Sequence, residues 1–459
     1  MGNTRIGMRW VSGIILSAAI AAGFAPATAG SGLGPVRHHA TCQGGGQAPD
    51  DNPDQVLEWN QIFIDMLIKS GTPNSSSQRL GAIVHTAIFD AYNGIERRYT
   101  PVFVSAMGPQ GASRRAAVIA AAYTALRSLF GAQQSELDML YRASLDALSE
   151  DGEDGGQARA LGILWGKQVA AAVLAWRAND GFGGVYDPFR GGTEVGQWRP
   201  TPPAFGPMSA QGLAFTRMFV LADELQFRPG PPRDLASETY TEDFNTVKRL
   251  GRRTGSDRSD EQTLLAPFWE GNATVHWNQA ANQIACANYS SISASNRLLA
   301  LLNIVMADTA ITTWSAKRFY GDTSPAEVTW RPVTSIPLAD DDGNSDTSAE
   351  AGWLPLVNTP SHPEYPAGHP SLNGAAATVL LSHFDDSQTF TLTTGPSSRT
   401  YTSIAQARSD GNNARVWGGM HYPTTVEISD AEGEAIARYI DVNAMLLTGG
   451  GGQGSDKKR

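Results

Sequence analysis

The segment PEYPAGH, residues 363–369, decides the fold expected of this chain, together with RVWGGMH at residues 415–421. Each segment ends in a histidine and contains groups suited to holding an oxyanion. Gly368 lets backbone N–H groups approach a ligand closely, and Arg415 offers a planar fork of donors that matches tetrahedral oxygens. One histidine can attack or ligate a central atom while the other moves protons. The two segments therefore predict a site for phosphate-type chemistry.

Two further cationic side chains precede these segments, Lys317 and Arg331, the second followed by Pro332. The formal net charge of the chain is −10, and no long basic run interrupts this acidic background. Such a balance argues against a nucleic acid or an anionic membrane surface as the partner. The local clustering of cations instead indicates a polybasic pocket for an oxyanion, assembled from three separated segments.

The order Lys317, Arg331-Pro332, PAGH at 366–369 and Arg415 with His421 resembles that of the vanadium-dependent haloperoxidases. The type 2 phosphatidic acid phosphatases and bacterial acid phosphatases share this pattern of Lys, Arg-Pro, Pro-Ser-Gly-His, then Arg, five residues and His. The last pair keeps the family spacing here. The stretches DTAITTWSAK, ending at Lys317, and WRPVT, around Arg331, resemble the haloperoxidases in particular. The resemblance by motif covers residues 300–440.

The resemblance implies an all-α protein built of helical bundles of the vanadium haloperoxidase and acid phosphatase type, with vanadate as the cofactor. His421 would bond to vanadate, and His369 would move protons. Four groups would balance the charge of the anion: Lys317, Arg331, the amide of Gly368, and Arg415. Hydrogen peroxide would then oxidise halide to hypohalous acid, with a small organic molecule as a possible acceptor.

Two residues near these motifs, His362 and Trp314, resemble the lining of a halide pocket. In the family, the position of His362 tends to hold an aromatic residue in chloride oxidisers and a histidine in bromide oxidisers. Trp314, three residues before Lys317, resembles the chloride-type pocket instead. The mixed signature favours bromide or iodide.

The chain departs from the family pattern in its oxyanion ligands. Ala367 stands where the family has serine, so one hydroxyl donor is missing, and a charge-assisted hydrogen bond contributes about 1.5–3 kcal/mol. Lys317 and Arg331 are separated by 13 residues, where the family has six, and Arg318 is an alternative to Lys317 in this role. Weak vanadate binding is therefore expected.

A further departure concerns the group that orients the second histidine. The family often has an aspartate four residues after it, and Thr425 stands there in this chain. Glu427 and Asp430 are the acidic residues nearby in sequence that could take its place.

Two other functions fit the same motifs. A phosphomonoesterase would use His421 as the nucleophile, forming a phosphohistidine, and His369 to protonate the leaving group. A catalytically weak or inactive oxyanion-binding protein is favoured by Ala367 and by the long segment between Lys317 and Arg331. The haloperoxidase-like stretches at 308–317 and 330–334 favour the peroxidase.

The amino terminus has the pattern of a secretory signal, with Arg5 and Arg9 before an apolar run and Ala27-Thr28-Ala29 as a cleavage site. A secreted or periplasmic location follows. In such a protein Cys42 and Cys286, the only cysteines, either pair or stay as thiols. The predicted divisions are a signal peptide at 1–29, a flexible segment at 30–52, an amino-terminal helical region at 53–290, a haloperoxidase/phosphatase-like catalytic region at 291–448, and a disordered tail at 449–459.

Helical periodicity covers most of the remaining chain. The predicted helices occupy residues 54–69, 78–93, 112–130, 134–148, 157–179, 237–250, 260–268, 276–287, 295–314, 374–384 and 429–447. Residues 389–394 alternate in the manner of a short strand. The Gly- and Pro-rich segment 181–207 carries several aromatic residues, which favours a long loop that covers a site over a domain linker.

Overall fold

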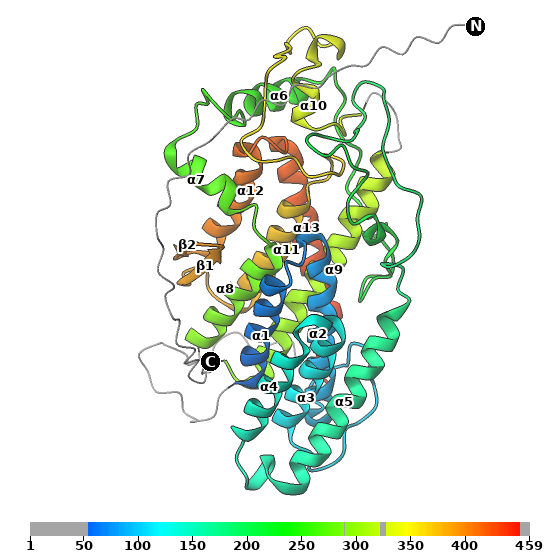
Figure 1. Cartoon of the computed structure of the whole chain (residues 1–459), viewed down its shortest axis with the longest axis vertical. Helices are drawn as coiled ribbons and strands as arrows, with labels where there is room; N and C mark the ends of the chain where they lie inside the picture. Colours follow the sequence, from blue (N-terminus) through cyan, green and yellow to red (C-terminus); the bar gives the residue numbers. More distant parts are fainter. Residues whose placement is uncertain (1–53, 289, 322–326, 450–459) are drawn as a thin grey trace, which may run out of the picture. The chain divides into compact units, whose positions relative to one another are not determined.

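Helices carry nearly all the regular structure in the computed structural model, which describes residues 54–288, 290–321 and 327–449 (Figure 1). The α-helices are α1 (Gln55–Lys69), α2 (Asn74–Glu96), α3 (Arg114–Leu129), α4 (Gln134–Asp146), α5 (Gly156–Ala178), α6 (Glu238–Leu250), α7 (Asp260–Phe268), α8 (Ala273–Ala287), α9 (Ile292–Gly321), α10 (Pro332–Ser335), α11 (Gly368–His383), α12 (Ile404–Trp417) and α13 (Pro423–Asn443). Short 3₁₀ helices are η1 (Gly131–Gln133), η2 (Gly152–Asp154), η3 (Gln211–Phe215) and η4 (Ala339–Asp341). The predicted signal peptide, the segment 30–52 and the tail beyond residue 449 lie outside the described residues.

The all-α prediction is confirmed, with one β-hairpin in the described residues. Strand β1 (Phe390–Thr394) pairs antiparallel with β2 (Ser397–Tyr401), with Phe390 opposite Tyr401. β1 corresponds to the alternating segment at 389–394, whereas the more polar β2 is not apparent from the sequence. Cys286, in α8, is disulfide-bonded, and Cys42 lies outside the described residues.

Helix α9 lies in the core, where it contacts helices from both the amino-terminal and the carboxy-terminal parts of the chain. It packs against α2 on one side and against α11 and α13 on another. By length and hydropathy this helix could cross a membrane, but the window that meets this criterion is completely buried inside the protein. It is therefore the central core helix around which the others are arranged.

Helices α11 and α13 approach each other closely because glycines line their contact. A Cβ atom on Gly433 would lie 1.8 Å from the carbonyl oxygen of Ser371, and one on Gly374 would lie 2.2 Å from that of Asp430. Only glycine fits where two backbones approach so closely. This contact packs the first turns of α11, which contain His369, against the middle of α13.

Several helix predictions needed correction. Helices α11 and α13 begin at Gly368 and Pro423, each six residues earlier than predicted. The sequence places the end of α2 before Gly94, but the helix continues to Glu96. Gly94 instead makes room for Trp165, since a Cβ atom there would lie 2.7 Å from the indole ring. Helix α12 is absent from the sequence prediction. It begins after Ser403, whose hydroxyl accepts the N–H of Gln406, and it carries Arg415 in its last turn.

The segment 181–207 forms no helix or strand, as predicted for a covering loop. It supports the chain that leads into Arg331, because the carbonyl of Gly196 accepts the N–H groups of Thr329 and Trp330. Residues 219–221, a little further along the chain from this segment, are held by Asp308 of α9. Its buried carboxylate accepts the N–H groups of Phe219, Val220 and Leu221. The loop is thus fastened to the core rather than linking two domains.

Candidate active site

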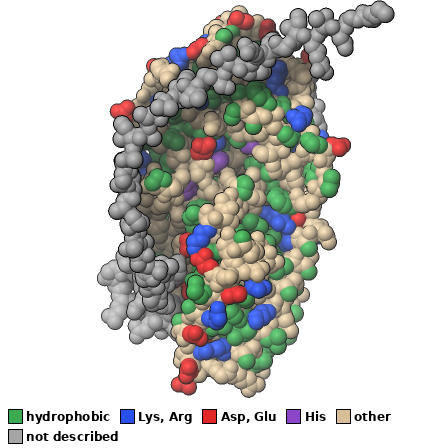
Figure 2. All heavy atoms as spheres, viewed as in Figure 1, with side chains coloured by type: hydrophobic (Ala, Val, Ile, Leu, Met, Phe, Trp, Pro, Cys, Tyr) green, Lys and Arg blue, Asp and Glu red, His purple; other side chains and the backbone are tan. Residues whose placement is uncertain are grey.

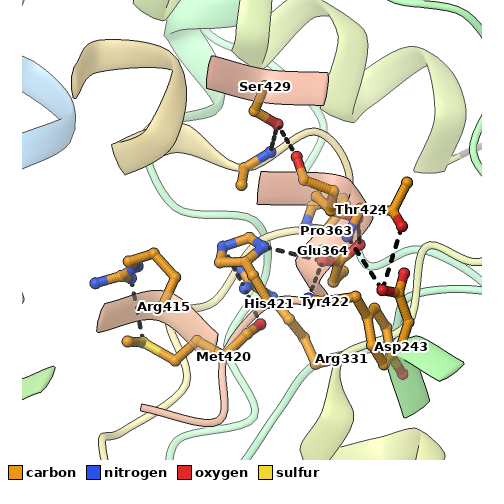
Figure 3. A network of polar contacts seen from close by, with 12 residues as sticks. Asp243, Arg331, Pro363, Glu364, Arg415, Met420, His421, Tyr422, Thr424 and Ser429 are labelled. Carbon is orange, nitrogen blue, oxygen red and sulfur yellow. Dashed lines mark hydrogen bonds and ion pairs between the residues drawn. The ribbon is translucent and has the colours of Figure 1, made fainter. Parts of the chain in front are cut away.

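The predicted site residues come from five separate parts of the chain, and Figure 3 shows three of them, Arg331, Arg415 and His421, close together. Lys317 lies near the end of α9, Arg331 immediately precedes α10, His369 lies in the first turn of α11, Arg415 lies in the last turn of α12, and His421 lies in the turn before α13. Four of these side chains are buried, and His369 is partly exposed. The face drawn in Figure 2 is hollowed, and histidine side chains are visible within the hollow.

Arg331 is the centre of the polar network. Its Nη1 donates to the carbonyl oxygen of Met420 at 2.8 Å and lies 2.9 Å from Nε2 of His421. On the other side, its Nε donates to the carbonyl oxygen of His362 at 2.9 Å, and Nη2 lies 2.8 Å from Nδ1 of the same residue. This one guanidinium therefore joins the two motif segments quoted above. Burial lowers the pKa of Arg331 to about 9, and the charge of Glu364 opposes that shift.

His421 is oriented by Glu364, a role that the sequence did not indicate. The carboxylate oxygen Oε1 lies 3.1 Å from Nδ1 of His421 and also accepts the N–H of Tyr422. Its other oxygen accepts the hydroxyl of Thr425 at 3.0 Å. A carboxylate accepts at every contact, so the imidazole carries its proton on Nδ1 and keeps a lone pair on Nε2. Burial lowers the pKa of His421 well below its usual value, and the charge of Arg331 lowers it further.

The two acidic residues expected near His421 lie elsewhere. Asp430 faces α12 and forms an ion pair with Arg408, and Glu427 is exposed on α13. The helix begins at Pro423, so Thr425 is the residue of its first turn that meets Glu364. Thr425 stands at the sequence position where the family pattern has an aspartate, and the carboxylate that it contacts is that of Glu364.

Lys317 takes the cationic position at the end of α9. Its Nζ donates to the carbonyl oxygen of Pro363 at 2.7 Å, while the guanidinium of Arg318 lies over the ring of Phe189 at 4.3 Å. Lys317 therefore joins the buried cluster, and Arg318 faces the covering loop. Burial lowers the pKa of Lys317 well below its usual value, and the charge of Arg331 adds to the effect.

Arg415 has donors to spare. Its Nη2 donates to Sδ of Met420 at 3.1 Å, whereas Nε and Nη1 are buried without a hydrogen-bond partner among the described residues. Burial lowers the pKa of Arg415 to about 10, which still leaves it charged near neutral pH. Buried donors are rarely left unpaired, because each one costs about 1–3 kcal/mol. An oxyanion beside His421 would satisfy both donors, so these residues fit vanadate or phosphate.

His369 is held by the amino-terminal part of the chain. Its Nε2 lies 3.2 Å from the carbonyl oxygen of Gly271 and 3.4 Å from the amide Nδ2 of Asn74, the first residue of α2. A carbonyl only accepts, so Nε2 carries a proton that it donates to Gly271, and Nδ1 keeps its lone pair. Nδ2 of Asn74 is also a donor, so in this tautomer it lies beside Nε2 without a hydrogen bond to it. Burial lowers the pKa of His369 well below its usual value, and the charge of Arg415 contributes. Asn74 and Gly271 were not predicted, because no sequence pattern links them to His369.

Among the described residues, the two hydroxyls next to Ala367, those of Ser371 and Ser429, do not replace the missing serine. The N–H of Ala367, which precedes α11, donates to Oγ of Ser429 at 2.7 Å, and that hydroxyl donates to the carbonyl oxygen of Thr425. Ser371 is also engaged, since its Oγ lies 2.9 Å from the carbonyl oxygen of Ala367 and 2.8 Å from Oε2 of Glu432. Both neighbouring hydroxyls are thus committed to the protein.

Trp314, His362 and Gly368 form one wall of the site. The rings of Trp314 and His362 have centroids 5.2 Å apart, and the indole Nε1 donates to the carbonyl oxygen of Ser209. A Cβ atom on Gly368 would lie 3.1 Å from the Trp314 ring, so a side chain there would crowd the indole. Gly368 also opens α11, whose first N–H groups lack intrahelical partners and are suited to an anion.

A buried carboxyl, Glu432 of α13, gives the site region a measurable pH dependence. Its Oε2 accepts the hydroxyls of Thr313 and Ser371, and burial raises its pKa to about 7. A raised carboxyl pKa means that the folded state binds the proton more tightly, so stability falls as pH rises from about 4.5 to 7. Glu432→Gln is expected to remove up to about 3 kcal/mol of this loss. Urea titrations of both forms at pH 5 and 8 measure it, and equal pH dependence in the two would contradict it.

We compared the chain with known protein families and solved structures. Residues 297–448 match the family model described as the VCPO second helical-bundle domain. A search of curated protein sequences finds no match. A solved structure of a bacterial vanadium-dependent iodoperoxidase aligns with a TM-score of 0.73 at 22% identity, covering 90% of this chain and 100% of that one.

A bacterial vanadium-dependent chloroperoxidase is similar as well. Its holo form aligns with a TM-score of 0.62 at 18% identity, covering 79% of this chain and 90% of that one. Its apo form gives a TM-score of 0.62 at 19% identity, with 79% and 91% covered. The chain therefore has the fold of the bacterial vanadium-dependent haloperoxidases, and its residues 297–448 match the second helical-bundle domain of that type.

Proposed function

We propose that this protein is a vanadate-dependent haloperoxidase that uses hydrogen peroxide to oxidise halide, with bromide or iodide preferred, to hypohalous acid. The observation that carries the proposal is the pair of unpartnered donors on Arg415 in a buried cluster with a neutral His421. The likeness of the fold to a bacterial iodoperoxidase and a bacterial chloroperoxidase supports it. We also propose that the protein is exported, as its amino-terminal sequence predicts.

The hydrogen bonds of the site residues indicate the role that each would take in catalysis. Nε2 of His421 has a lone pair that accepts from Nη1 of Arg331 in this structure, and it would ligate the anion once that guanidinium donates to the anion instead. Glu364 holds the ring in place. Lys317, Arg331, Arg415 and the first N–H groups of α11 would balance its negative charge. Bound vanadate supplies a Lewis acid that polarises hydrogen peroxide without needing to change its oxidation state.

His369 would move the protons. Its Nδ1 is free to accept one from the incoming peroxide, because Nε2 is held by Gly271. The neutral imidazole is in the right state to accept, and it would return the proton to the oxygen that leaves with the halogen. The wall formed by Trp314 and His362 would contact the halide and any small organic acceptor.

A phosphomonoesterase is the second candidate function. The hydrogen bond between Glu364 and His421 suits this activity as well as it suits halide oxidation. An oriented neutral imidazole with its lone pair on Nε2 can attack phosphorus as well as ligate vanadium, once Arg331 donates to the anion instead of to Nε2. The purified protein is therefore assayed in parallel with vanadate, peroxide and each halide, and with a phosphate ester alone. Halide oxidation that needs vanadate supports the proposal, and phosphate release in its absence supports the phosphatase. Anion binding without either turnover would indicate an oxyanion-binding protein.

Replacing His369 should separate proton transfer from anion binding. The His369→Ala variant is expected to bind vanadate with nearly unchanged affinity and to lose about 10²–10⁴-fold in turnover, as expected for loss of a general acid–base group. Calorimetric titration and steady-state assays measure the two quantities. His383→Ala is the control, since that histidine lies at the other end of α11 and is exposed. Equal losses of binding and turnover in His369→Ala would refute this division of roles.

Restoring the missing hydroxyl should tighten anion binding. Ser371 and Ser429 are both engaged, so Ala367 leaves a donor position vacant that Ala367→Ser would fill. The gain is expected to reach about 1.5–3 kcal/mol, roughly ten- to a hundredfold in the dissociation constant of vanadate. Titration of both forms measures it. Equal affinities would show that the site needs no hydroxyl at this position.

A further inference from the structure

We propose that the thioether of Met420 is an oxidative modification site, converted to the sulfoxide by the oxidant that forms in the pocket during turnover. This inference rests on the proposed function. Met420 directly precedes His421 and is completely buried. Its sulfur lies 3.1 Å from Nη2 of Arg415, which donates to it, and its carbonyl oxygen accepts from Arg331 (Figure 3). The sulfur is therefore one hydrogen bond away from a guanidinium that would hold the oxyanion.

The chemistry needs only the product of the proposed reaction. A thioether sulfur has two lone pairs, and the bond from Arg415 uses one of them. The other attacks the halogen of hypohalous acid and displaces hydroxide, which gives a halosulfonium ion. Water then attacks the sulfur, halide leaves, and the water loses two protons, one of which neutralises the hydroxide. The sulfur loses two electrons and the halogen gains them, so R₂S and HOX give R₂S=O, H⁺ and X⁻. The product is methionine sulfoxide, which replaces an apolar side chain with a polar one.

Burial makes this site distinguishable from ordinary oxidation. Met107 and Met139 are 69% and 61% exposed, so an oxidant in bulk solvent reaches them first. Met306 is as completely buried as Met420 but lies on α9 eleven residues before Lys317, about 16 Å along the helix. Only an oxidant released inside the pocket would select Met420 over Met306.

Oxidation would also act on the oxyanion site. A sulfoxide oxygen is a stronger acceptor than a thioether sulfur, so it would hold Nη2 of Arg415 more tightly. The added oxygen must fit among Ala266 and Val357, which pack against Met420 in a small apolar cluster. Both effects draw Arg415 away from the anion, and loss of activity should therefore accompany the modification.

The test uses the full-length protein with vanadate, bromide and peroxide, and it follows each methionine by peptide mass spectrometry as turnovers accumulate. Met420 sulfoxide is expected to appear at least several-fold faster than Met306 sulfoxide, in step with the loss of rate. Hypobromite added from outside should instead modify Met107 and Met139 first. The Met420→Leu variant should lose its own initial rate several-fold more slowly per turnover than wild type, whereas Met306→Leu should match wild type.

The outcomes separate the two proposals. An active protein in which Met420 stays a thioether, or is oxidised no faster than Met306, overturns this inference and leaves the proposed function intact. A protein that oxidises no halide overturns both. If Met420→Leu does not fold, the wild-type ratio of the two sulfoxides still decides the question.

Discussion

The His421→Ala variant is expected to fall below about one thousandth of wild-type halide oxidation, since it removes the Nε2 lone pair that would ligate the anion beside Arg331. Vanadate binding should weaken in parallel, because the remaining ligands hold the anion by charge and hydrogen bonds alone. Steady-state assays at increasing vanadate measure both effects. Wild-type turnover in this variant would show that the site lies elsewhere.

The same substitution should lower stability without unfolding the helices. Glu364 and Arg331 each lose a buried partner when the imidazole is removed, and an unpaired buried group costs about 1–3 kcal/mol. Far-UV circular dichroism should remain that of a helical protein while the thermal midpoint falls. A collapse of the helical signal would mean that lost activity reports lost fold.

The Glu364→Gln variant should show the second large effect, a roughly ten- to hundredfold weaker affinity for vanadate. The carboxylate accepts from His421, the N–H of Tyr422 and the hydroxyl of Thr425, and an amide must turn its NH₂ toward one of these donors. The imidazole then loses its fixed orientation and its Nδ1 proton preference. Vanadate titration measures the change.

A matched control exists on the same helix as Thr425. Glu427 is the acidic residue that sequence spacing suggests beside His421, but it is exposed. Glu427→Gln should leave both affinity and rate at wild-type values. A loss in that variant, with none in Glu364→Gln, would reverse the assignment of the orienting carboxylate.

Sequence periodicity predicted the helices whose apolar faces are strong, such as α1 and α9, and it failed where packing replaces propensity. Helix α12 contains the run SDGNN at 409–413, whose residues are poor helix formers. It is stabilised by its cap at Ser403 and by packing against α11 and α7. Local sequence patterns therefore did not predict the helix that carries Arg415.

The residues of the candidate site also fall into two groups, those that sequence motifs indicate and those that only the fold brings together. Arg415 and His421 are six positions apart, so their shared motif was apparent from the chain alone. Glu364 lies within the quoted segment, yet its partner Thr425 is 61 residues away, and only the fold brings them together. Asn74 is 295 residues from His369 and had no sequence signal at all.

The contacts of His369 limit how this protein could be rebuilt from parts. Asn74 and Gly271 both precede residue 297, where the match to the helical-bundle family begins. A chimera that transplants residues 297–448 onto a different amino-terminal half would carry the anion-holding side chains with it. It would leave behind the carbonyl that accepts from His369 and the amide that lies beside its ring. The candidate site is thus built by residues from both halves of the chain, and moving residues 297–448 alone would not reproduce it.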